Sequence, residues 1–230
     1  QRFLDPRRHF GHPFRTEFVI GDGIAIMHRK GGVEAVAIQL VLVIADNHRH
    51  IHAGLRKDVR QPLDLLLSNI SVSKTVQFIQ GGATRQESVY NGLQGLPDSA
   101  ERVLIHDGAR CLATPDLFDR CAASLATCQG LIAAVSVKDT IKIVDNMGIV
   151  VDTPDRANLW AAQTPQGFDV KLLKDCHDKG RALGWEVTDD AALFEKCSLP
   201  VTIVPGEETN LKITTPVDLA IAEFILRSRV

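Results

Sequence analysis

The stretch VLIHDGARCLATPDLF, residues 103–118, places the end of a buried strand close to the start of a helix. Its apolar beginning predicts a strand over Arg102–His106. Thr114 followed by Pro115 predicts the start of a helix, because Thr caps free backbone N–H groups and Pro suits the first helical turn. A strand that leads through a short turn into a helix is the repeating unit of an α/β fold.

The turn between this strand and this helix carries a carboxylate and a guanidinium, Asp107 and Arg110. Ligands of α/β sheets bind beyond the carboxyl ends of the strands, so these two side chains are well placed for a site. Asp107 suits a metal–phosphate complex, and the planar guanidinium of Arg110 suits a phosphate. The alternative is an ordinary loop, since Asp107-Gly108 is also a common turn pair.

From about residue 71 onward, predicted strands and helices alternate along the chain. Further strands are expected at Thr75–Gln80, Leu131–Val135 and Leu199–Val204, and further helices at Gln86–Leu96, Asp169–Leu183, Asp189–Cys197 and from Thr215-Pro216 onward. This alternation predicts an α/β sandwich with a largely parallel sheet.

One segment, Val135–Asp152, breaks the alternation. Apolar and polar residues alternate up to Val144, the chain turns at Asn146-Met147-Gly148, and an apolar run returns without a helix. This pattern predicts a β-hairpin. We expect the hairpin to project from the sheet and to pair with a second subunit.

The composition is that of an ordinary globular chain of 230 residues, with 45% hydrophobic and 23% charged residues. A formal net charge of −2 gives no electrostatic case for binding nucleic acid or an anionic membrane. No uncharged apolar run is long enough to predict a membrane-spanning helix. The five Cys residues form no CxxC pair, and their odd number fits reduced thiols in the cytoplasm.

Residues 1–70 differ in character from the remainder. Most of the His residues lie there, including the alternating run HRHIH, residues 48–52. Alternate positions of a strand share a face, which makes this run a candidate metal site. Asp46 is the one nearby carboxylate and there is no nearby Cys, so a solvated polar segment is the favoured interpretation.

Two other strand ends offer features that suit a ligand. Gly81-Gly82 follows a predicted strand, so a ligand can approach the backbone there without meeting a Cβ atom. Lys212 precedes the last helix, whose N-terminal end disfavours a cation. An anion bound between the helix end and the ammonium group would explain this placement.

Six motifs follow one another along the chain: GGATRQESVYNGL (81–93), VLIHDGARC (103–111), VKDTIK (137–142), TPDRANLWAAQTPQGF (153–168), VTDDAALFE (187–195) and NLKITTPVDLAIAE (210–223). Together they closely resemble the 2-C-methyl-D-erythritol 4-phosphate cytidylyltransferase family of the non-mevalonate isoprenoid pathway. The resemblance covers roughly residues 71–230. It implies a nucleotidyltransferase (Rossmann-like) three-layer sandwich, the use of CTP and Mg²⁺, and a cytoplasmic homodimer whose projecting arms, residues 137–156, complete each other's sites.

The resemblance also implies roles for particular residues. The implied nucleotide-binding residues are Gly81, Gly82, Ser88 and Asp107, the sugar-phosphate contacts are Arg110, Thr140 and Thr164, and the catalytic pair that orients the attacking phosphate is Arg156 and Lys212. Asp107 is also the implied metal ligand. Thr140 and Arg156, at the ends of the arm, are expected to serve the other subunit's site. Two positions depart mildly from the pattern, with Gly108 in place of Ala and Cys111 in place of Pro.

The front of the chain departs more seriously. Members of the family open with a strand, a Gly-rich loop of the form A-A-G-x-G-x-R-M and a later Lys, which together bind the triphosphate, and nothing in residues 1–70 matches. VIGDGIAIMHRKGG, residues 19–32, has glycines and basic residues in a different arrangement. We therefore expect an anomalous N-terminal segment, 1–70, and a cytidylyltransferase domain, 71–230. QPLDLLL, residues 61–67, is a weak match at which family-like sequence would resume.

A shift of reading frame, or a wrongly assigned coding sequence, over residues 1–60 or more would account for this mismatch. Without the family's first strand, the edge of a neighbouring strand is expected to be exposed. Loss of the triphosphate loop predicts low stability and trace activity for the chain.

The implied reaction is an in-line attack by a phosphate oxygen of methylerythritol phosphate on the α-phosphorus of CTP, with pyrophosphate as the leaving group. Positioning and electrostatics would supply most of the catalysis. Two alternatives stay open. Ribitol-5-phosphate cytidylyltransferases share much of the same pattern, and a catalytically inactive dimeric homologue would also lack the triphosphate loop.

Overall fold

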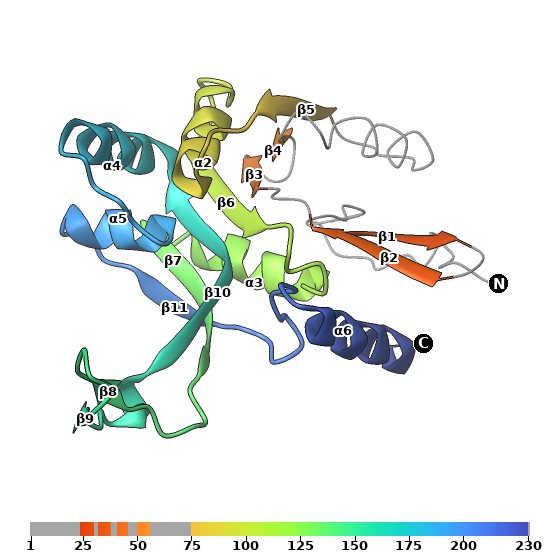
Figure 1. Ribbon diagram of the computed structural model, residues 1–230. Coiled ribbons are helices and arrows are strands. Elements are labelled where there is room, and N and C mark those ends of the chain that lie inside the picture. The colour runs from red at the N-terminus through yellow and green to blue at the C-terminus, as the bar shows by residue number, and fades with distance from the viewer. Residues whose placement is uncertain (1–23, 30–31, 38–40, 46–49, 56–74, 230) are drawn as a thin grey trace.

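A seven-stranded sheet forms the centre of the described part of the molecule (Figure 1). The structure, a computed structural model, describes residues 24–29, 32–37, 41–45, 50–55 and 75–229. In spatial order the strands are β11 (Thr202–Pro205), β7 (Gly130–Ser136), β10 (Trp160–Asp169), β6 (Arg102–Asp107), β3 (Val41–Ala45), β4 (His50–Leu55) and β5 (Thr75–Gln80).

The sheet is mixed. The neighbours β11 and β7 are parallel, as are β4 and β5, whereas the other four pairs are antiparallel. β10 and β3 therefore run against the other five strands, which share one direction. The predicted α/β sandwich is confirmed. Most of its strands run in the same direction, as expected, but most neighbouring pairs are antiparallel because β10 and β3 are inserted in the opposite direction.

Helices cover both faces of the sheet and give the expected three layers. α2 (Arg85–Gln94), α4 (Val170–Ala182) and α5 (Asp190–Lys196) lie on one face, and α3 (Pro115–Ser124) lies on the other. The alternation of β6 shows why: Val103 and Ile105 pack with the first group, whereas Leu104 packs with α3. The last helix, α6 (Pro216–Ser228), buries Ala222 against a smaller apolar cluster.

The predicted helix starts are confirmed by their caps. Thr114 accepts a hydrogen bond from the backbone N–H of Leu117 at the start of α3. Thr215 caps α6, and Asp218 returns a bond to the Thr215 backbone N–H in a reciprocal capping box. Asp169 caps α4 by accepting a hydrogen bond from the backbone N–H of Leu172. Side chains of short reach therefore fix where the helices begin.

The central strand β10 was not among the predicted strands. Pro165 lies within it, and a proline in a strand interior ordinarily argues against a central strand because it cannot donate to the ladder. The register with β7 shifts between Ala162 and Gln166, which accommodates the proline. β10 thus pairs with both β6 and β7, although its sequence shows no alternating pattern that would predict a strand.

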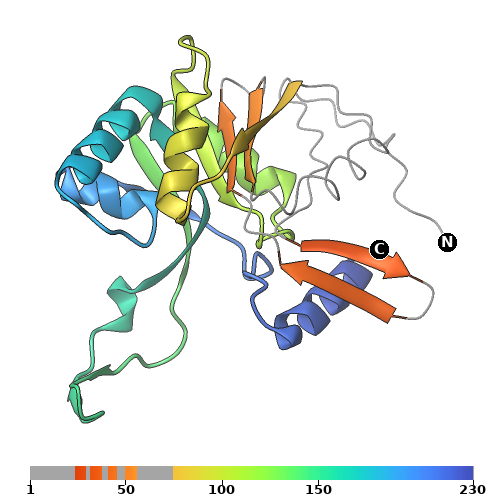
Figure 2. The same cartoon turned by 45° about the horizontal axis from the view of Figure 1, so that its top comes forward.

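The predicted hairpin is confirmed, and it projects from the sheet within the connection between β7 and β10, residues 137–159, which extends three residues beyond the predicted arm of 137–156. It contains β8 (Ile143–Val144), β9 (Val150–Asp152) and a 3₁₀ turn, η2 (Arg156–Asn158). Figures 1 and 2 both show the arm standing away from the sheet, at the far ends of β7 and β10. Its strands are exposed along their whole length.

The described N-terminal strands correct one expectation. β3 pairs with β6 over its whole length, with Val41 opposite Asp107 and Ala45 opposite Val103. The expectation that the edge of a neighbouring strand would be exposed is therefore wrong for β6, because β3 occupies that edge in the antiparallel sense. β1 (Ile24–Arg29) and β2 (Gly32–Ala37) form a separate antiparallel pair.

The His run proposed as a candidate metal site lies partly outside the described residues, and the side chains of its remainder are not described. The same is true of the basic residues within 19–32. Among the helices that the structure describes, none combines the length and apolar character needed to cross a membrane.

Candidate active site

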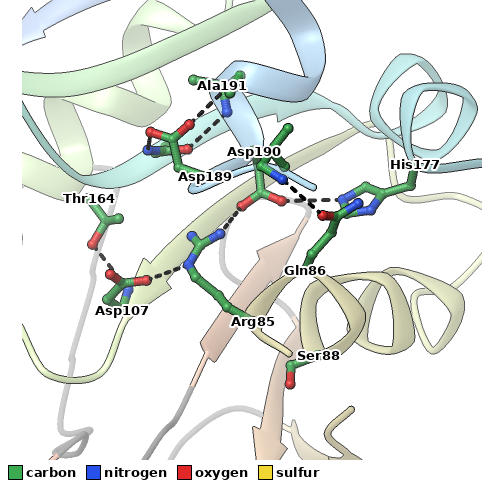
Figure 3. A network of polar contacts seen from close by, with 12 residues as sticks. Arg85, Gln86, Ser88, Asp107, Thr164, His177, Asp189, Asp190 and Ala191 are labelled. Carbon is green, nitrogen blue, oxygen red and sulfur yellow. Dashed lines mark hydrogen bonds and ion pairs between the residues drawn. The ribbon is translucent and has the colours of Figure 1, made fainter. Parts of the chain in front are cut away.

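Asp107 is the last residue of β6, and each polar group of this residue has a defined partner. Its backbone N–H donates to Thr164 Oγ1 at 3.0 Å. Its Oδ1 accepts from Arg85 Nε at 2.9 Å, and its Oδ2 accepts from Lys212 Nζ at 2.9 Å. Figure 3 shows Asp107 between Thr164 and Arg85. The strand end thus presents a carboxylate shared by two cations.

Asp107 stays ionised in this setting. Burial raises the pKa of its carboxyl group, but the positive charges and hydrogen bonds of Arg85 and Lys212 outweigh that effect and lower the pKa to about 2. A carboxylate that stays charged and keeps one exchangeable partner is suited to binding a cation or a charged substrate complex.

The charged chain continues beyond Arg85 into the core. Arg85 Nη1 contacts Asp190 Oδ2 at 2.8 Å, and Asp190 Oδ1 contacts His177 Nε2 at 3.2 Å (Figure 3). Asp190 is 1% exposed and His177 is completely buried. We call these five residues, Lys212, Asp107, Arg85, Asp190 and His177, the Asp107 cluster.

Asp190 and Arg85 hold each other in the charged state. Burial raises the pKa of Asp190, but Arg85 and His177 outweigh it and the pKa is lowered overall. Burial lowers the pKa of Arg85, but the two carboxylates outweigh it and the pKa rises. The cluster therefore contains two carboxylates and two cations in addition to the imidazole.

The loop that carries Lys212 is fixed by buried amides. Asn210 is completely buried, and its Nδ2 donates to Gln163 Oε1 and to the Thr164 carbonyl. Gln163 Nε2 donates to the Glu207 carbonyl at 2.9 Å. The backbone of the loop is thus anchored to β10, while the Lys212 side chain remains 46% exposed.

The Gly81-Gly82 loop lies between β5 and α2. The Gly82 N–H donates to Ser88 Oγ at 3.0 Å, and Ser88 Oγ donates to the Thr84 carbonyl at 2.9 Å. A Cβ atom on Gly82 would lie 2.1 Å from the Cβ atom of Glu87, so only glycine fits. The loop folds closely onto α2, and Arg85, the first residue of α2, joins it to Asp107.

Thr164 and Arg110 lie next to Asp107 but have partners within the chain. Thr164 is buried, and its hydroxyl bonds His106 Nδ1 as well as the Asp107 N–H. Burial lowers the pKa of His106 to about 4, so its imidazole is neutral. Arg110 donates to the backbone carbonyls of Asn210 and Ala162. The Thr164 hydroxyl therefore stabilises the end of β6, and the Arg110 guanidinium stabilises the neighbouring backbone.

Thr140 and Arg156 lie on the arm instead. Arg156 Nη1 donates to the Lys138 carbonyl at 2.9 Å, and both residues are exposed. Among the residues that the structure describes, neither contacts the Asp107 cluster. One chain therefore brings together the glycine loop, Asp107, Thr164, Arg110 and Lys212, but not the two arm residues.

No role was predicted for Arg85, Asp190 and His177. Arg85 lies within the first motif, and Asp190 follows Asp189 in the fifth. Asp189 caps α5 by accepting from the Ala192 N–H, which accounts for one of the two aspartates. The second aspartate, which is not needed as a cap, is the one local sign that this residue has another role, but it does not indicate the partner.

Asp107 is the one carboxylate of the cluster with a half-exposed partner, and this decides how a divalent cation could be held. The described residues contain no group of three or more His, Cys, Asp or Glu side chains that could hold a metal ion. Mg²⁺ is commonly held by one or two carboxylates together with substrate phosphates and water. Asp107 therefore fits Mg²⁺ in a complex with phosphates, as the single protein carboxylate.

Comparisons with known proteins point to one family. A family model described as 2-C-methyl-D-erythritol 4-phosphate cytidylyltransferase matches residues 51–228. A protein of that name from Crocosphaera subtropica is 72% identical over 176 residues, which cover 74% of this chain and 77% of the relative. One from Microcystis aeruginosa is 74% identical over 164 residues, covering 71% of this chain and 73% of the relative.

Solved structures agree with these sequence matches. A crystal structure of 4-diphosphocytidyl-2C-methyl-D-erythritol synthase from Anaerococcus prevotii superposes with a TM-score of 0.74 at 35% identity, covering 79% of this chain and 83% of that one. A 2-C-methyl-D-erythritol 4-phosphate cytidylyltransferase from Thermus thermophilus gives a TM-score of 0.60 at 36% identity, covering 66% and 74%.

Proposed function

Because this chain belongs to the 2-C-methyl-D-erythritol 4-phosphate cytidylyltransferase family, we propose that its reaction occurs at the Asp107 end of the sheet. The reaction transfers CMP from CTP to 2-C-methyl-D-erythritol 4-phosphate and releases pyrophosphate, a step of non-mevalonate isoprenoid synthesis. The observation that carries this location is the pairing of an ionised Asp107 with a half-exposed Lys212. Such a pair can receive a charged phosphate and its counter-ion together.

The chemistry asks for little covalent work from the protein. A phosphate oxygen of the sugar phosphate attacks the α-phosphorus of CTP, a new P–O bond forms, and the bond to pyrophosphate breaks. The attacking oxygen is already ionised, so no general base is needed. Lys212 holds the attacking phosphate and, with Arg156, orients it in line with the leaving group.

Asp107 is the residue that would hold Mg²⁺, together with phosphate oxygens. The ion would neutralise the negative charge that the phosphates bring into the site. Lys212 leaves Oδ2 of Asp107 when it contacts a phosphate, which makes that oxygen available.

The glycine loop and the neighbouring turn supply the rest of the binding surface. We propose that the backbone of Gly81 and Gly82 lies against the cytosine, with Ser88 fixing the loop from behind through the Gly82 N–H. Arg110 and Thr164 act on the sugar-phosphate side, where their present bonds to backbone and to Asp107 fix the shape of the turn.

The arm supports a homodimer. Its apolar side chains are exposed, and Met147 at its tip is 86% exposed. We propose that two copies pair through their arms and that Thr140 and Arg156 of each copy reach the other's Asp107 end. The five cysteines all lie within the described residues and none of them forms a disulfide bond there, which fits a reducing cytoplasm.

We also propose that residues 71–230 form the cytidylyltransferase domain and that residues 1–70 are anomalous. The family match begins at residue 51, so the mismatch is concentrated before that point. A shift of reading frame accounts for it, and translating the coding DNA of that segment in the other two frames would reveal the A-A-G-x-G-x-R-M loop.

Pyrophosphate release from CTP, followed with a coupled assay sensitive to trace turnover, tests the proposed function. We expect release with 2-C-methyl-D-erythritol 4-phosphate and much less with ribitol 5-phosphate at equal concentration. A greater rate with ribitol 5-phosphate would assign the chain to the alternative substrate. Binding of CTP without release under both conditions would leave only a binding protein.

A further inference from the structure

The two oxygens of Asp107 are held by partners of very different mobility. Oδ2 bonds the ammonium group of Lys212, whose side chain is 46% exposed. Oδ1 bonds the guanidinium of Arg85, whose side chain is 18% exposed. The first partner can leave for a ligand in the solvent, whereas the second is largely enclosed.

Arg85 is enclosed because a buried acid holds its other end. Its Nη1 contacts Asp190 Oδ2 at 2.8 Å, and Asp190 contacts the buried imidazole of His177. α2, β6, α4 and α5 each contribute one member of this chain of contacts, Arg85, Asp107, His177 and Asp190 in that order. A guanidinium fixed on two sides holds its partner carboxylate in one orientation.

We propose that Arg85, fixed by Asp190 and His177, is a positioning residue that holds Oδ1 of Asp107 so that Oδ2 can pass from Lys212 to a divalent cation. This inference rests on the proposed function, because the event that takes Lys212 away is its contact with a substrate phosphate. It adds three residues to the site that touch neither substrate nor cation.

The charges of the cluster fit such an exchange. Asp107 and Asp190 together balance Arg85 and Lys212, so the four groups are neutral as a set. When Lys212 turns to a phosphate, the remaining three carry one net negative charge, which favours a cation at Oδ2. Arg85 opposes that cation by its charge, so its benefit must lie in the orientation of the carboxylate.

Charge and orientation predict opposite results, which makes the inference testable. Mn²⁺ binding to the full chain is measured by electron paramagnetic resonance, and the binding that remains in Asp107→Asn is subtracted. Lys212→Ala, which imitates the departure of Lys212, is expected to bind Mn²⁺ about 10-fold more tightly than the parent. Adding Arg85→Gln is expected to abolish that gain, although charge alone predicts still tighter binding.

A control and a second variant keep the result interpretable. Arg181 lies over the Tyr90 ring at 4.3 Å and is not part of the cluster, so Arg181→Gln in the Lys212→Ala background is expected to keep the gain. Asp190→Asn in the same background is expected to lose it, even if the Arg85 variant fails to fold. Thermal unfolding shows which variants are folded.

Mn²⁺ binding that tightens further in the Arg85 variant, or stays tight in the Asp190 variant, would overturn the inference and leave Arg85 as a structural link between helices. The result of the Mn²⁺ experiment can be distinguished from the result of the test of the proposed function. Absence of pyrophosphate release in the parent would refute the function, whereas the order of Mn²⁺ affinities still decides the role of Arg85.

Discussion

The Asp107 cluster and the arm are opposites in how their side chains are satisfied. In the cluster, charged side chains from α2, β6, α5 and the loop before α6 form ion pairs with one another, and His177 of α4 contacts one of the two carboxylates, Asp190. On the arm, Ile143, Met147 and Val150 are 47%, 86% and 54% exposed. The cluster is complete within one copy of the chain, whereas the arm leaves apolar surface that a single copy does not cover.

The difference is concentrated in a short segment. Of the fourteen large hydrophobic side chains described as exposed, seven lie within residues 141–151. Exposed apolar patches of this kind commonly mark protein–protein contacts. The contrast teaches that folding of one chain satisfies the charged groups of the cluster, whereas the apolar side chains of the arm would be covered only in the proposed dimer.

The largest expected effect concerns the triphosphate-binding loop, which the proposed site beside the cluster still lacks. Replacing residues 1–50 with a family-type segment that carries the A-A-G-x-G-x-R-M loop and its Lys is expected to raise turnover by roughly 10⁴-fold or more. Each donor aimed at developing phosphate charge is worth ~10²–10³ in rate, and the loop supplies several. Pyrophosphate release by the grafted and original chains measures the gain.

The matched control for the graft carries Ala in place of the loop's Arg and Lys, and it is expected to lose most of the gain while keeping any increase in stability. If the original chain turned over as fast as the graft, residues 1–50 would already supply a triphosphate site. The proposed site would then need no grafted loop.

The next effect tests whether the cluster is the reaction centre. In the grafted chain, whose turnover is high enough to measure the loss, Asp107→Ala is expected to lower turnover at least ~10³-fold, because it removes the charged group aimed at the phosphates. It also leaves Arg85 and Lys212 without a shared partner, so a stability loss of about 1–3 kcal/mol is expected. Asp152→Ala, on the arm, is the control. Near-normal turnover by the Asp107 variant would remove the reaction from this strand end.

Much of the sheet and of its helices could be predicted, because local signals specify them. Thr114-Pro115 and Thr215-Pro216 mark helix starts by capping, and the apolar run ending at Asp107 marks a strand. β10 could not be predicted, since Pro165 hides it and its pairing comes from strands distant in sequence. The antiparallel place of β3 has no local signal either.

The same distinction holds for the site. Asp107 and Lys212 were predicted to lie near one end of the sheet, and the structure joins them directly. The bridge from Arg85 to Asp190 spans 105 positions in the sequence. Such an ion pair depends on how α2 and α5 pack, and no spacing rule within one element reveals it.

The third effect tests the arm. Arg156→Ala and Lys212→Ala are each expected to be inactive alone, but mixed subunits are expected to recover about a quarter of the parent activity. Half of the randomly mixed dimers contain both kinds of subunit, and each of these has one intact site of two. Subunit exchange is verified by a size or affinity tag on one variant. A mixture that exchanges but stays inactive would place both residues in the same chain's site.

The smallest expected effect is a difference between the cluster and the arm in how the free energy of unfolding depends on pH. The pKa of Asp107 in the folded chain is about 2, below its ordinary value of 3.8, so its contribution to stability is complete above pH 4 and is lost as pH falls through about 2. Between pH 5 and about 2, urea unfolding should show the parent losing about 2 kcal/mol more than Asp107→Asn. Asp152→Asn removes an equal charge from the exposed arm, and its curve is expected to follow the parent. If the Asp107 variant also followed the parent, the two cations would not be stabilising this carboxylate, and the view of the cluster as a unit completed by folding would fail.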